Sequence, residues 1–377
     1  MATAEFRYVT TSVYQSGGSA NPIIAELPFT SVNFTQQLNS IGTFQGEVLL
    51  SGLNSANLNV YNGTIPSKTI LWVLYSDPQT LATIPVWSGV IWNREYDSEN
   101  QRLHITAQEM LSLYQRRRIS DTKTYTSKDP TYIAKDLMQY TEAKSYGKTG
   151  LTYATLPSSG YSTNRTYNNF EFKSVYQAVK DLAQSYFDFA IKPYNTGGVL
   201  TNQFVIGIPL GTVYTTTSPI ASVFQFPGNL ISYKFPEDGN TAANKLYGLG
   251  YGANGTKLAA TAVDSSKYTD GFPLLEDVAN YIDIADLNLL KATTLGQLNA
   301  ISYPPTTIEI VVPPYVDPYY PQYNIGDEVR LDIVDDYFPS GLSIVLRIVA
   351  ISVSPGENGP SRVSLTLTRQ LAAGSVS

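Results

Sequence analysis

Short segments in which hydrophobic and polar residues alternate dominate residues 1–118. In one of them Leu103 and Ile105 share one face of an extended chain, and His104 takes the other. Turn sequences such as Asn62-Gly63 separate the segments. We therefore predict a first β domain, a barrel or sandwich, over residues 1–118. Its strands are expected at Glu5–Val13, Ile23–Phe29, Gly42–Leu50, Thr69–Ser76, Pro85–Tyr96 and Arg102–Ala107.

The hydrophobic spacing becomes helical in residues 119–225. Asp129 followed by Pro130 predicts a helix start, because Asp caps a helix and Pro suits its first turn. Ser174 predicts a second start, and Leu151–Asn169 is expected to be a polar loop between the two helices. This part is therefore predicted to be an inserted α+β module. The apolar face of the first helix is expected to contain Ile133, Leu137 and Tyr140, and that of the second Val175, Val179, Leu182 and Tyr186. Two strands are expected after the second helix, at Phe187–Pro193 and Gln203–Ile208.

Residues 226–377 return to strand patterns, interrupted by one helix. The hairpin-plus-helix part, residues 246–300, is predicted as an insertion into a second β domain made of residues 226–245 and 301–377. The expected fold class is thus mainly β with α+β insertions. Along the chain we expect strand Leu230–Phe235, hairpin Leu246–Ala262, helix Ala285–Ala300, strand Thr307–Val312, loop Pro313–Tyr323, turn Asn324–Asp327, and strands Glu328–Ile333, Leu342–Val353 and Arg362–Thr368.

Composition narrows the function classes. The 377 residues suffice for about two to four domains. Only 15% of residues are charged and 28 are Tyr, which suits both strands and large packed interfaces. A net charge of −6 argues against a nucleic-acid-binding surface but allows a channel through which DNA passes. The sequence has no Cys, no signal-peptide pattern and no apolar run of membrane-spanning length.

Few residues carry the chemistry that catalysis needs. His104, the single histidine, lies in a predicted strand without a nucleophile motif, and one His without Cys disfavours a zinc site. The carboxylate pairs Glu26/Glu47 and Asp335/Asp336 remain as candidates for glycoside hydrolysis. Asp335 and Asp336 adjoin a turn sequence, and extended neighbours point to opposite faces. We therefore expect a solvated turn there.

A glycine-rich stretch could cradle phosphate, but its context differs from a phosphate-binding loop. Gly248, Gly250 and Gly252 are followed by a predicted strand and lack the Lys-Ser/Thr of such loops. A hairpin loosened by glycine is the better interpretation. The sequence thus predicts no catalytic residue, no cofactor and no metal site.

The order of several weak motifs is more specific than any one of them. Together they resemble the tail hub, or tail-associated (minor tail), proteins of long-tailed bacteriophages, over essentially the whole chain. The motifs are Leu27–Ser31 followed by Gly42–Val48, Trp87–Ile91, Leu103–Glu109, Arg116–Ile119, Ser174–Ala183, Gly248–Gly252 and Ile325–Leu331.

This resemblance implies a baseplate-hub-like fold, in which two tube-like antiparallel β-barrels carry two smaller peripheral modules. It implies a structural, non-enzymatic homotrimer that joins the sixfold tail tube or distal tail ring to the threefold tip. Further implied partners are the tape measure protein and other tail tip or receptor-binding proteins, with DNA only as transiting cargo. The expected location is the virion tail tip, after assembly in the host cytoplasm and without membrane insertion.

Two groups of residues are candidates for contacts between subunits. Arg116, Arg117 and Arg118 form the one basic cluster, which is either solvated, paired with the acidic surface of a partner, or in contact with DNA. A tyrosine-rich loop supplies Tyr315, Tyr319, Tyr320 and Tyr323. Two rival functions stay open from the residues alone: a β-rich polysaccharide hydrolase or depolymerase that uses paired carboxylates, and a tail protein that binds a host receptor.

Overall fold

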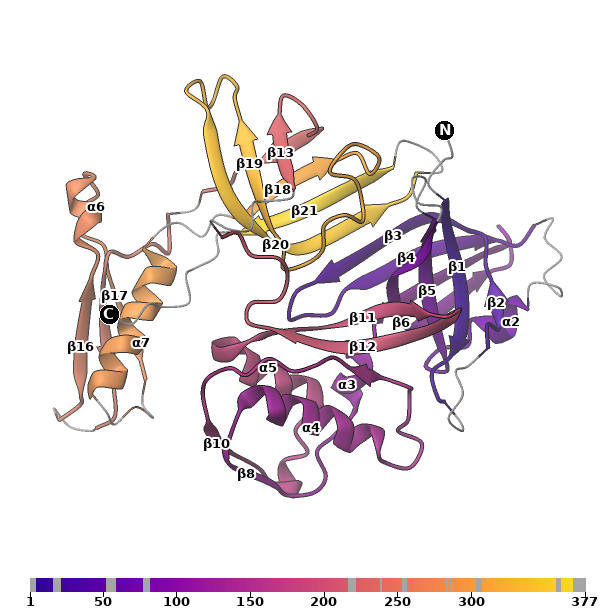
Figure 1. The fold of residues 1–377 in the computed structure, drawn as a ribbon, viewed down its shortest axis with the longest axis horizontal. Coiled ribbons are helices and arrows are strands. Elements are labelled where there is room, and N and C mark those ends of the chain that lie inside the picture. Colours follow the sequence, from indigo (N-terminus) through magenta and orange to yellow (C-terminus); the bar gives the residue numbers. More distant parts are fainter. Residues whose placement is uncertain are drawn as a thin grey trace. The chain divides into compact units, whose positions relative to one another are not determined.

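The computed structural model describes residues 5–15, 22–51, 59–76, 82–215, 222–237, 239–252, 256–281, 284, 287–302, 307–356 and 361–368. The chain is mainly β, as predicted (Figure 1). It divides into two compact units, which we call unit 1 (Met1–Ser232 and Val311–Leu365) and unit 2 (Tyr233–Ile310 and Thr366–Ser377). The finer division into four parts stays a prediction.

A large antiparallel sheet forms the centre of unit 1. Its order is β20-β3-β4-β7-β6-β5-β1-β2, and the register places Phe34 opposite Val353 and Phe44 opposite Ala107. Because β3 pairs with β20, the two predicted β blocks share one sheet. Closure into two tubes stays a prediction. The strands are β1 (Glu5–Ser12), β2 (Ala25–Glu26), β3 (Phe29–Gln37), β4 (Thr43–Leu49), β5 (Thr69–Ser76), β6 (Thr83–Asp97), β7 (Arg102–Glu109) and β20 (Leu342–Ser354).

Two further strands, most of a third and one short helix also belong to unit 1. Beyond β20 lie β19 (Glu328–Ile333) and β21 (Arg362–Thr368), and β13 (Val223–Phe226) pairs in parallel with β19. The helix α2 (Val60–Gly63) precedes β5. The last three predicted strands of the chain therefore form where the hydrophobic pattern placed them, as β19, β20 and β21.

Alternation along the strands decides which side chains form the core. In β7, Leu103, Ile105 and Ala107 are buried, as the sequence predicted, while the intervening residues face away from the core. Aromatic rings join this core edge to face: Phe44 lies 5.1 Å from Phe29 between ring centroids. Each such buried ring removes a large apolar area from water, so the sheet is stabilised mainly by this face.

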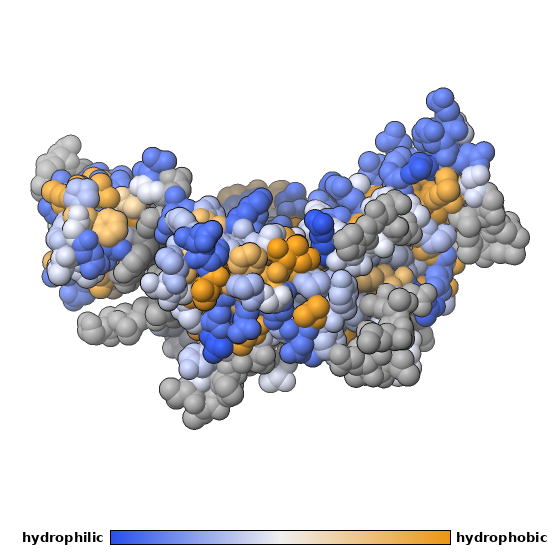
Figure 2. Space-filling view, turned by 90° about the horizontal axis from the view of Figure 1, so that it is seen from above, coloured by the Kyte–Doolittle hydropathy of each residue, from blue (hydrophilic) through white to orange (hydrophobic). Residues whose placement is uncertain are grey.

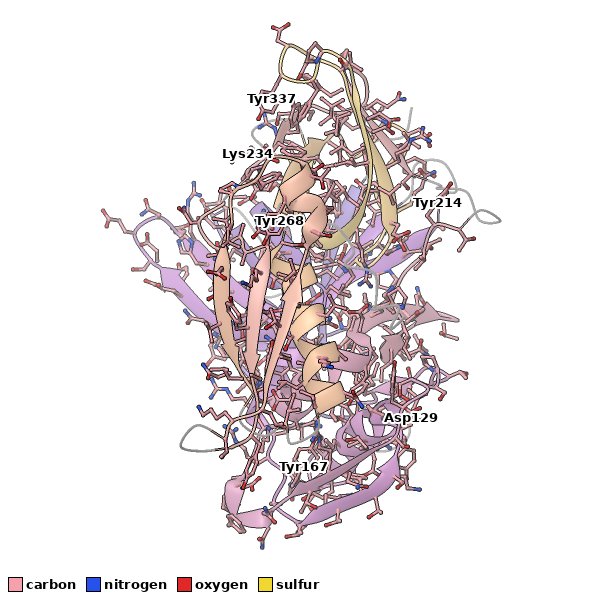
Figure 3. All side chains as sticks on the ribbon, turned by 90° about the vertical axis from the view of Figure 1, so that its left-hand side faces the viewer. Asp129, Tyr167, Tyr214, Lys234, Tyr268 and Tyr337 are labelled. Atoms are coloured by element: carbon pink, nitrogen blue, oxygen red, sulfur yellow. The ribbon has the colours of Figure 1, made fainter. Side chains whose placement is uncertain are left out.

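Residues 111–207 form the helical part of unit 1, and its two longest helices, α4 and α5, begin at the two predicted capping residues. The Asp129 side chain accepts a hydrogen bond from the Thr131 backbone N–H at 2.9 Å, and Ser174 accepts one from Gln177 at 3.1 Å. Figure 3 labels Asp129 at this helix start. The elements are α3 (Leu111–Arg116), β8 (Lys123–Lys128), α4 (Pro130–Glu142), β9 (Thr152–Tyr153), β10 (Thr163–Tyr167), η1 (Asn169–Glu171), α5 (Val175–Tyr186), β11 (Asp188–Thr196) and β12 (Val199–Gly207).

This helical part shares its core with the sheet. Ile133 of α4 and Val179 of α5 belong to the same buried cluster as Val9 and Trp72 of the sheet. Figure 1 shows α3, α4 and α5 beside the β11–β12 hairpin. Within unit 1, the inserted segment and the large sheet therefore share one continuous apolar core.

One prediction for this part was wrong. The segment Leu151–Asn169 is not simply a polar loop, because β9 pairs with β12 and β10 pairs with β8. Tyr167 of β10 is buried and lies 6.3 Å from the Tyr125 ring. Both strands are too short and too polar to produce a hydrophobic alternation, so their pairing partners determine them.

Unit 2 combines a three-stranded sheet with one long helix. The sheet order is β16-β15-β17, and α7 packs against β15 and β16. The predicted helix is confirmed, with Leu290, Thr294 and Leu298 buried. The elements are β15 (Lys245–Leu249), β16 (Ala259–Val263), α6 (Ser265–Thr269), β17 (Glu276–Asn280) and α7 (Leu287–Ile301); β14 (Ser232–Lys234) and β18 (Thr307–Val312) lie where the chain passes between the units. Among the described helices, none is both long enough and apolar enough to cross a membrane.

Candidate assembly surfaces

Arg117 lies in a polar centre that is mostly buried. Its Nη1 is 2.5 Å from Glu142 Oε1, and the two side chains are only 14% and 12% exposed. The Tyr114 hydroxyl donates to Glu142 Oε1 at 2.7 Å, and the Thr149 backbone N–H donates to Oε2 at 2.8 Å. Arg117 also donates to the Gly147 carbonyl. The charge of this arginine thus joins the ends of α3 and α4 within the chain.

The other two arginines of the cluster are exposed. The Arg116 guanidinium lies over the Trp92 ring, 5.3 Å from its centroid. The backbone of Arg118 forms an isolated bridge with Ser174, and the residue is exposed. The sequence alone does not distinguish the three consecutive arginines. In the structure Arg117 differs from its neighbours because it pairs with the mostly buried Glu142. An interface role for the cluster stays a prediction.

The tyrosine-rich loop is packed largely into its own chain. Tyr319, Tyr320 and Tyr323 are buried, and Tyr320 lies 5.9 Å from the Tyr75 ring. Tyr315 differs, since its side chain is 66% exposed. As the loop stands, Tyr315 is the tyrosine of this group that a partner could reach. Whether the group forms an interface stays a prediction.

A second buried ion pair was not foreseen from the sequence. Arg347 of β20 places Nη2 2.5 Å from Asp188 Oδ2 of β11, and the side chains are 10% and 14% exposed. Arg347 also donates to the carbonyls of Leu210 at 2.6 Å and Gly326 at 2.9 Å, and Asn39 donates to Asp188 Oδ1 at 2.7 Å. This centre ties a C-terminal strand to the inserted segment. An arginine within the apolar run of β20 is the signal that could have indicated it.

The predicted turn before β19 is part of the same centre. Gly326 has a φ of 93°, which L side chains rarely adopt. A Cβ atom there would lie 2.3 Å from the Leu210 carbonyl oxygen. The turn therefore needs glycine for both its conformation and its close approach, and the sequence predicted this turn correctly.

The candidate carboxylates are engaged in local structure. Asp335 Oδ1 accepts hydrogen bonds from the backbone N–H groups of Tyr337 at 3.0 Å and Phe338 at 2.9 Å, as expected for a turn. Glu47 pairs with Arg102 at 2.7 Å and lies 3.1 Å from His104 Nδ1. Within the described ranges, no group of three or more His, Cys, Asp and Glu side chains could hold a metal ion.

Glu109 is a buried acid that the sequence analysis did not single out. It ends β7, and its Oε2 accepts a hydrogen bond from the Gly42 N–H at 2.6 Å. Burial raises the pKa of its carboxyl to about 8. Glu109 lines a cavity of about 300 Å³ together with Lys192 and Tyr320, and it is the sole carboxylate in that described lining. Glycoside hydrolases usually place two carboxylates around the scissile bond, and this described lining supplies one.

The glycine-rich stretch of unit 2 serves helix packing. A Cβ atom on Gly248 would lie 1.9 Å from Thr294 Oγ1 of α7, and Thr294 is fully buried. Gly248 therefore allows α7 to approach β15 closely. The hairpin predicted here is confirmed by the antiparallel pairing of β15 with β16.

Substituting Gly248 by Ala is expected to destabilise unit 2 by about 1–3 kcal/mol, because the new methyl group must displace α7. Amide hydrogen exchange of Leu287–Ile301 should then become faster. Gly296→Ala is the matched control, since a Cβ there meets no atom within 4 Å and Ala favours a helix. Equal exchange in Gly248→Ala and the wild type would contradict this account of the glycine.

Comparisons with known proteins agree with this fold. No family model and no curated protein matches the chain. The 43 kDa tail protein of prophage MuSo2 from Shewanella oneidensis aligns over 97% of this chain and 99% of its own, with 11% identity and a TM-score of 0.62. A tail protein from Neisseria meningitidis MC58 aligns over 96% and 97%, with 13% identity and a TM-score of 0.61.

A third similar structure is part of a two-protein complex. One chain of the Francisella PdpA–VgrG complex aligns over 97% of this chain and 58% of its own, with 9% identity and a TM-score of 0.60. At these identities the similarity establishes a shared fold. The chain thus has the fold of phage tail proteins, as the order of its sequence motifs indicated.

Proposed function

We propose that this protein is a structural component of a phage tail tip or baseplate, and that three copies form a hub. The single observation that carries the proposal is the match with two tail proteins over nearly the full length of both partners. A match of that extent accounts for the inserted segments as well as for the sheets.

In this proposal the hub joins the sixfold tail tube or distal tail ring to the threefold tip, and its centre forms part of the DNA ejection channel. Tape measure protein and other tip proteins are further proposed partners, and assembly occurs in the host cytoplasm. The net charge of −6 supports a wall that does not retain DNA. Exposed tyrosines such as Tyr61, Tyr96 and Tyr315 suit contacts between proteins.

The distribution of hydrophobic residues over the surface suits contacts with several neighbouring proteins. On the face drawn in Figure 2, hydrophobic residues lie in separate patches among hydrophilic ones. Interfaces commonly combine small apolar patches with a polar rim. A hub that contacts different neighbours would use such patches separately.

A non-enzymatic role is part of the proposal. In the candidate pair Glu26/Glu47 both carboxylates form ion pairs with arginines, and in the pair Asp335/Asp336 the first carboxylate holds a turn. Zymography on cell-wall and capsular polysaccharide tests the rival function directly. Clearing by the purified chain would overturn the structural assignment.

The oligomeric state gives the main test. Light scattering of the purified chain is expected to give about three times the 41.3 kDa of one chain, because a hub must bury surface between its copies. If the chain forms trimers only on a co-expressed ring protein, the mixed complex should contain three copies of it. Electron micrographs of the same fraction should then show rings. A strictly monomeric chain that forms no mixed complex with co-expressed tail proteins would contradict the proposal.

A further inference from the structure

A cavity of about 550 Å³ in unit 1 has a strongly basic lining. It opens where the ends of α3 and α4 meet the segments before β5 and after β1. Backbone hydrogen bonds fix its walls: the Val13 N–H donates to the Lys68 carbonyl at 2.8 Å, and the Gln15 N–H donates to the Lys148 carbonyl at 3.0 Å. The cavity is therefore formed before any ligand binds.

Its cations outnumber its acids. The described lining contains Lys68, Arg117, Arg118, Lys144 and Lys148 and no carboxylate. Arg117 is neutralised by the buried Glu142 behind the wall. The Lys144 Nζ donates to the Arg118 carbonyl and the Ser120 hydroxyl, both at 2.8 Å.

Three of these cations remain available to a ligand. Lys68, Arg118 and Lys148 are exposed and form no ion pair with any described residue. On a chain whose net charge is −6, such a group creates a local positive potential, which a concave wall strengthens. The cavity thus attracts an anionic group.

Two tyrosines add aromatic area beside the cations. Tyr14 and Tyr146 line the cavity with their ring centroids 5.9 Å apart, and they are 43% and 87% exposed. Tyr146 has a φ of 60°, a conformation that costs free energy for an aromatic residue and that the surrounding turn imposes. The turn after α4 therefore presents this ring to solvent.

We propose that this cavity binds an acidic protein segment of a neighbouring tail component, with carboxylates against Lys68, Arg118 and Lys148 and an aromatic side chain against the two tyrosines. The inference rests on the proposed structural role, which supplies the neighbour. The amides of Gly147 and Thr149 already donate within the chain, so they cannot form the amide nest that suits phosphate. The net charge of −6 disfavours a nucleic-acid strand as the ligand, because its phosphates would be repelled by the rest of the chain.

Fluorescence anisotropy with the full chain tests the proposal. The probes are a labelled peptide Glu-Glu-Tyr-Glu-Glu, its Gln-Gln-Tyr-Gln-Gln counterpart, and a labelled five-nucleotide thymidine oligomer at low salt. We expect the acidic peptide to bind about tenfold more tightly than either other probe. Its affinity should fall as the salt concentration rises. The double variant Lys68→Gln/Lys148→Gln should bind the acidic peptide with about tenfold lower affinity, because both cations are lost.

The matched control is Lys128→Gln/Arg165→Gln, which removes two exposed cations of β8 and β10 outside the cavity lining. This variant should bind the acidic peptide as the wild type does. Equal or tighter binding of the oligonucleotide would overturn the proposal in favour of nucleic acid, and so would unchanged peptide binding by the cavity variant. The measurement needs only the purified chain, so its failure is distinguishable from a failure to form trimers.

Discussion

Replacing Arg347 by Met is expected to lower the free energy of unfolding of unit 1 by about 3–5 kcal/mol. The substitution keeps apolar volume but leaves the mostly buried Asp188 carboxylate without its cation. It also removes the hydrogen bonds to the carbonyls of Leu210 and Gly326. A buried charge that loses its partner costs much more than the pair contributes, because its desolvation is no longer compensated.

Denaturant unfolding followed by tryptophan fluorescence measures this effect, since the three tryptophans, Trp72, Trp87 and Trp92, all lie in unit 1. The control is Arg330→Met, whose partner Asp332 lies at 3.1 Å in a more exposed pair. That pair should contribute less than about 1 kcal/mol. The account of the buried centre would fail if both variants lost the same small amount of stability.

Local structure could be predicted from local sequence. The start of α4 follows from Asp129 and Pro130, whose capping chemistry acts within three residues. The helix α7 and the strand β7 follow from hydrophobic spacing, because the same period decides which face is buried. These elements depend on neighbours along the chain, which a sequence displays.

Pairings between distant segments could not be predicted. The β3–β20 pairing joins residues about 300 positions apart, and no feature of either strand specifies the other. The short strands β9 and β10 exist only because β12 and β8 offer edges to them. The sequence therefore predicted the kind of fold but not how its β blocks share one sheet.

The candidate surfaces show the same limit at the level of single side chains. The sequence displays Arg116–Arg118 as one basic cluster, but the burial of Arg117 depends on Glu142, which lies in another helix. The basic cavity draws Lys68 and Lys148 from separate segments. A charge acquires its role from the groups that the fold brings around it, and those groups become known only with the tertiary structure.

Glu109 makes the stability of unit 1 depend on pH in a direction opposite to that of most carboxylates. Below its ordinary pKa of 4.5 the carboxyl is protonated in both the folded and the unfolded chain, so it contributes no pH dependence. Between pH 4.5 and about 8 the folded chain keeps the proton and the unfolded chain releases it. Stability is therefore lost as pH rises through this window, by at most about 1.4 kcal/mol for each pH unit.

Glu109→Gln is accordingly expected to stabilise unit 1 by a few kcal/mol at pH 8, relative to the wild type, and to change little at pH 5. Gln keeps the size of the side chain and an oxygen that can accept the Gly42 N–H, but it carries no charge to desolvate. Urea unfolding at pH 5, 6.5 and 8, followed by tryptophan fluorescence, measures the difference. The exposed Glu99→Gln is the control and should show no such pH-dependent gain. If the gain from Glu109→Gln were the same at pH 5 and pH 8, the buried carboxyl would not be holding its proton in the folded chain.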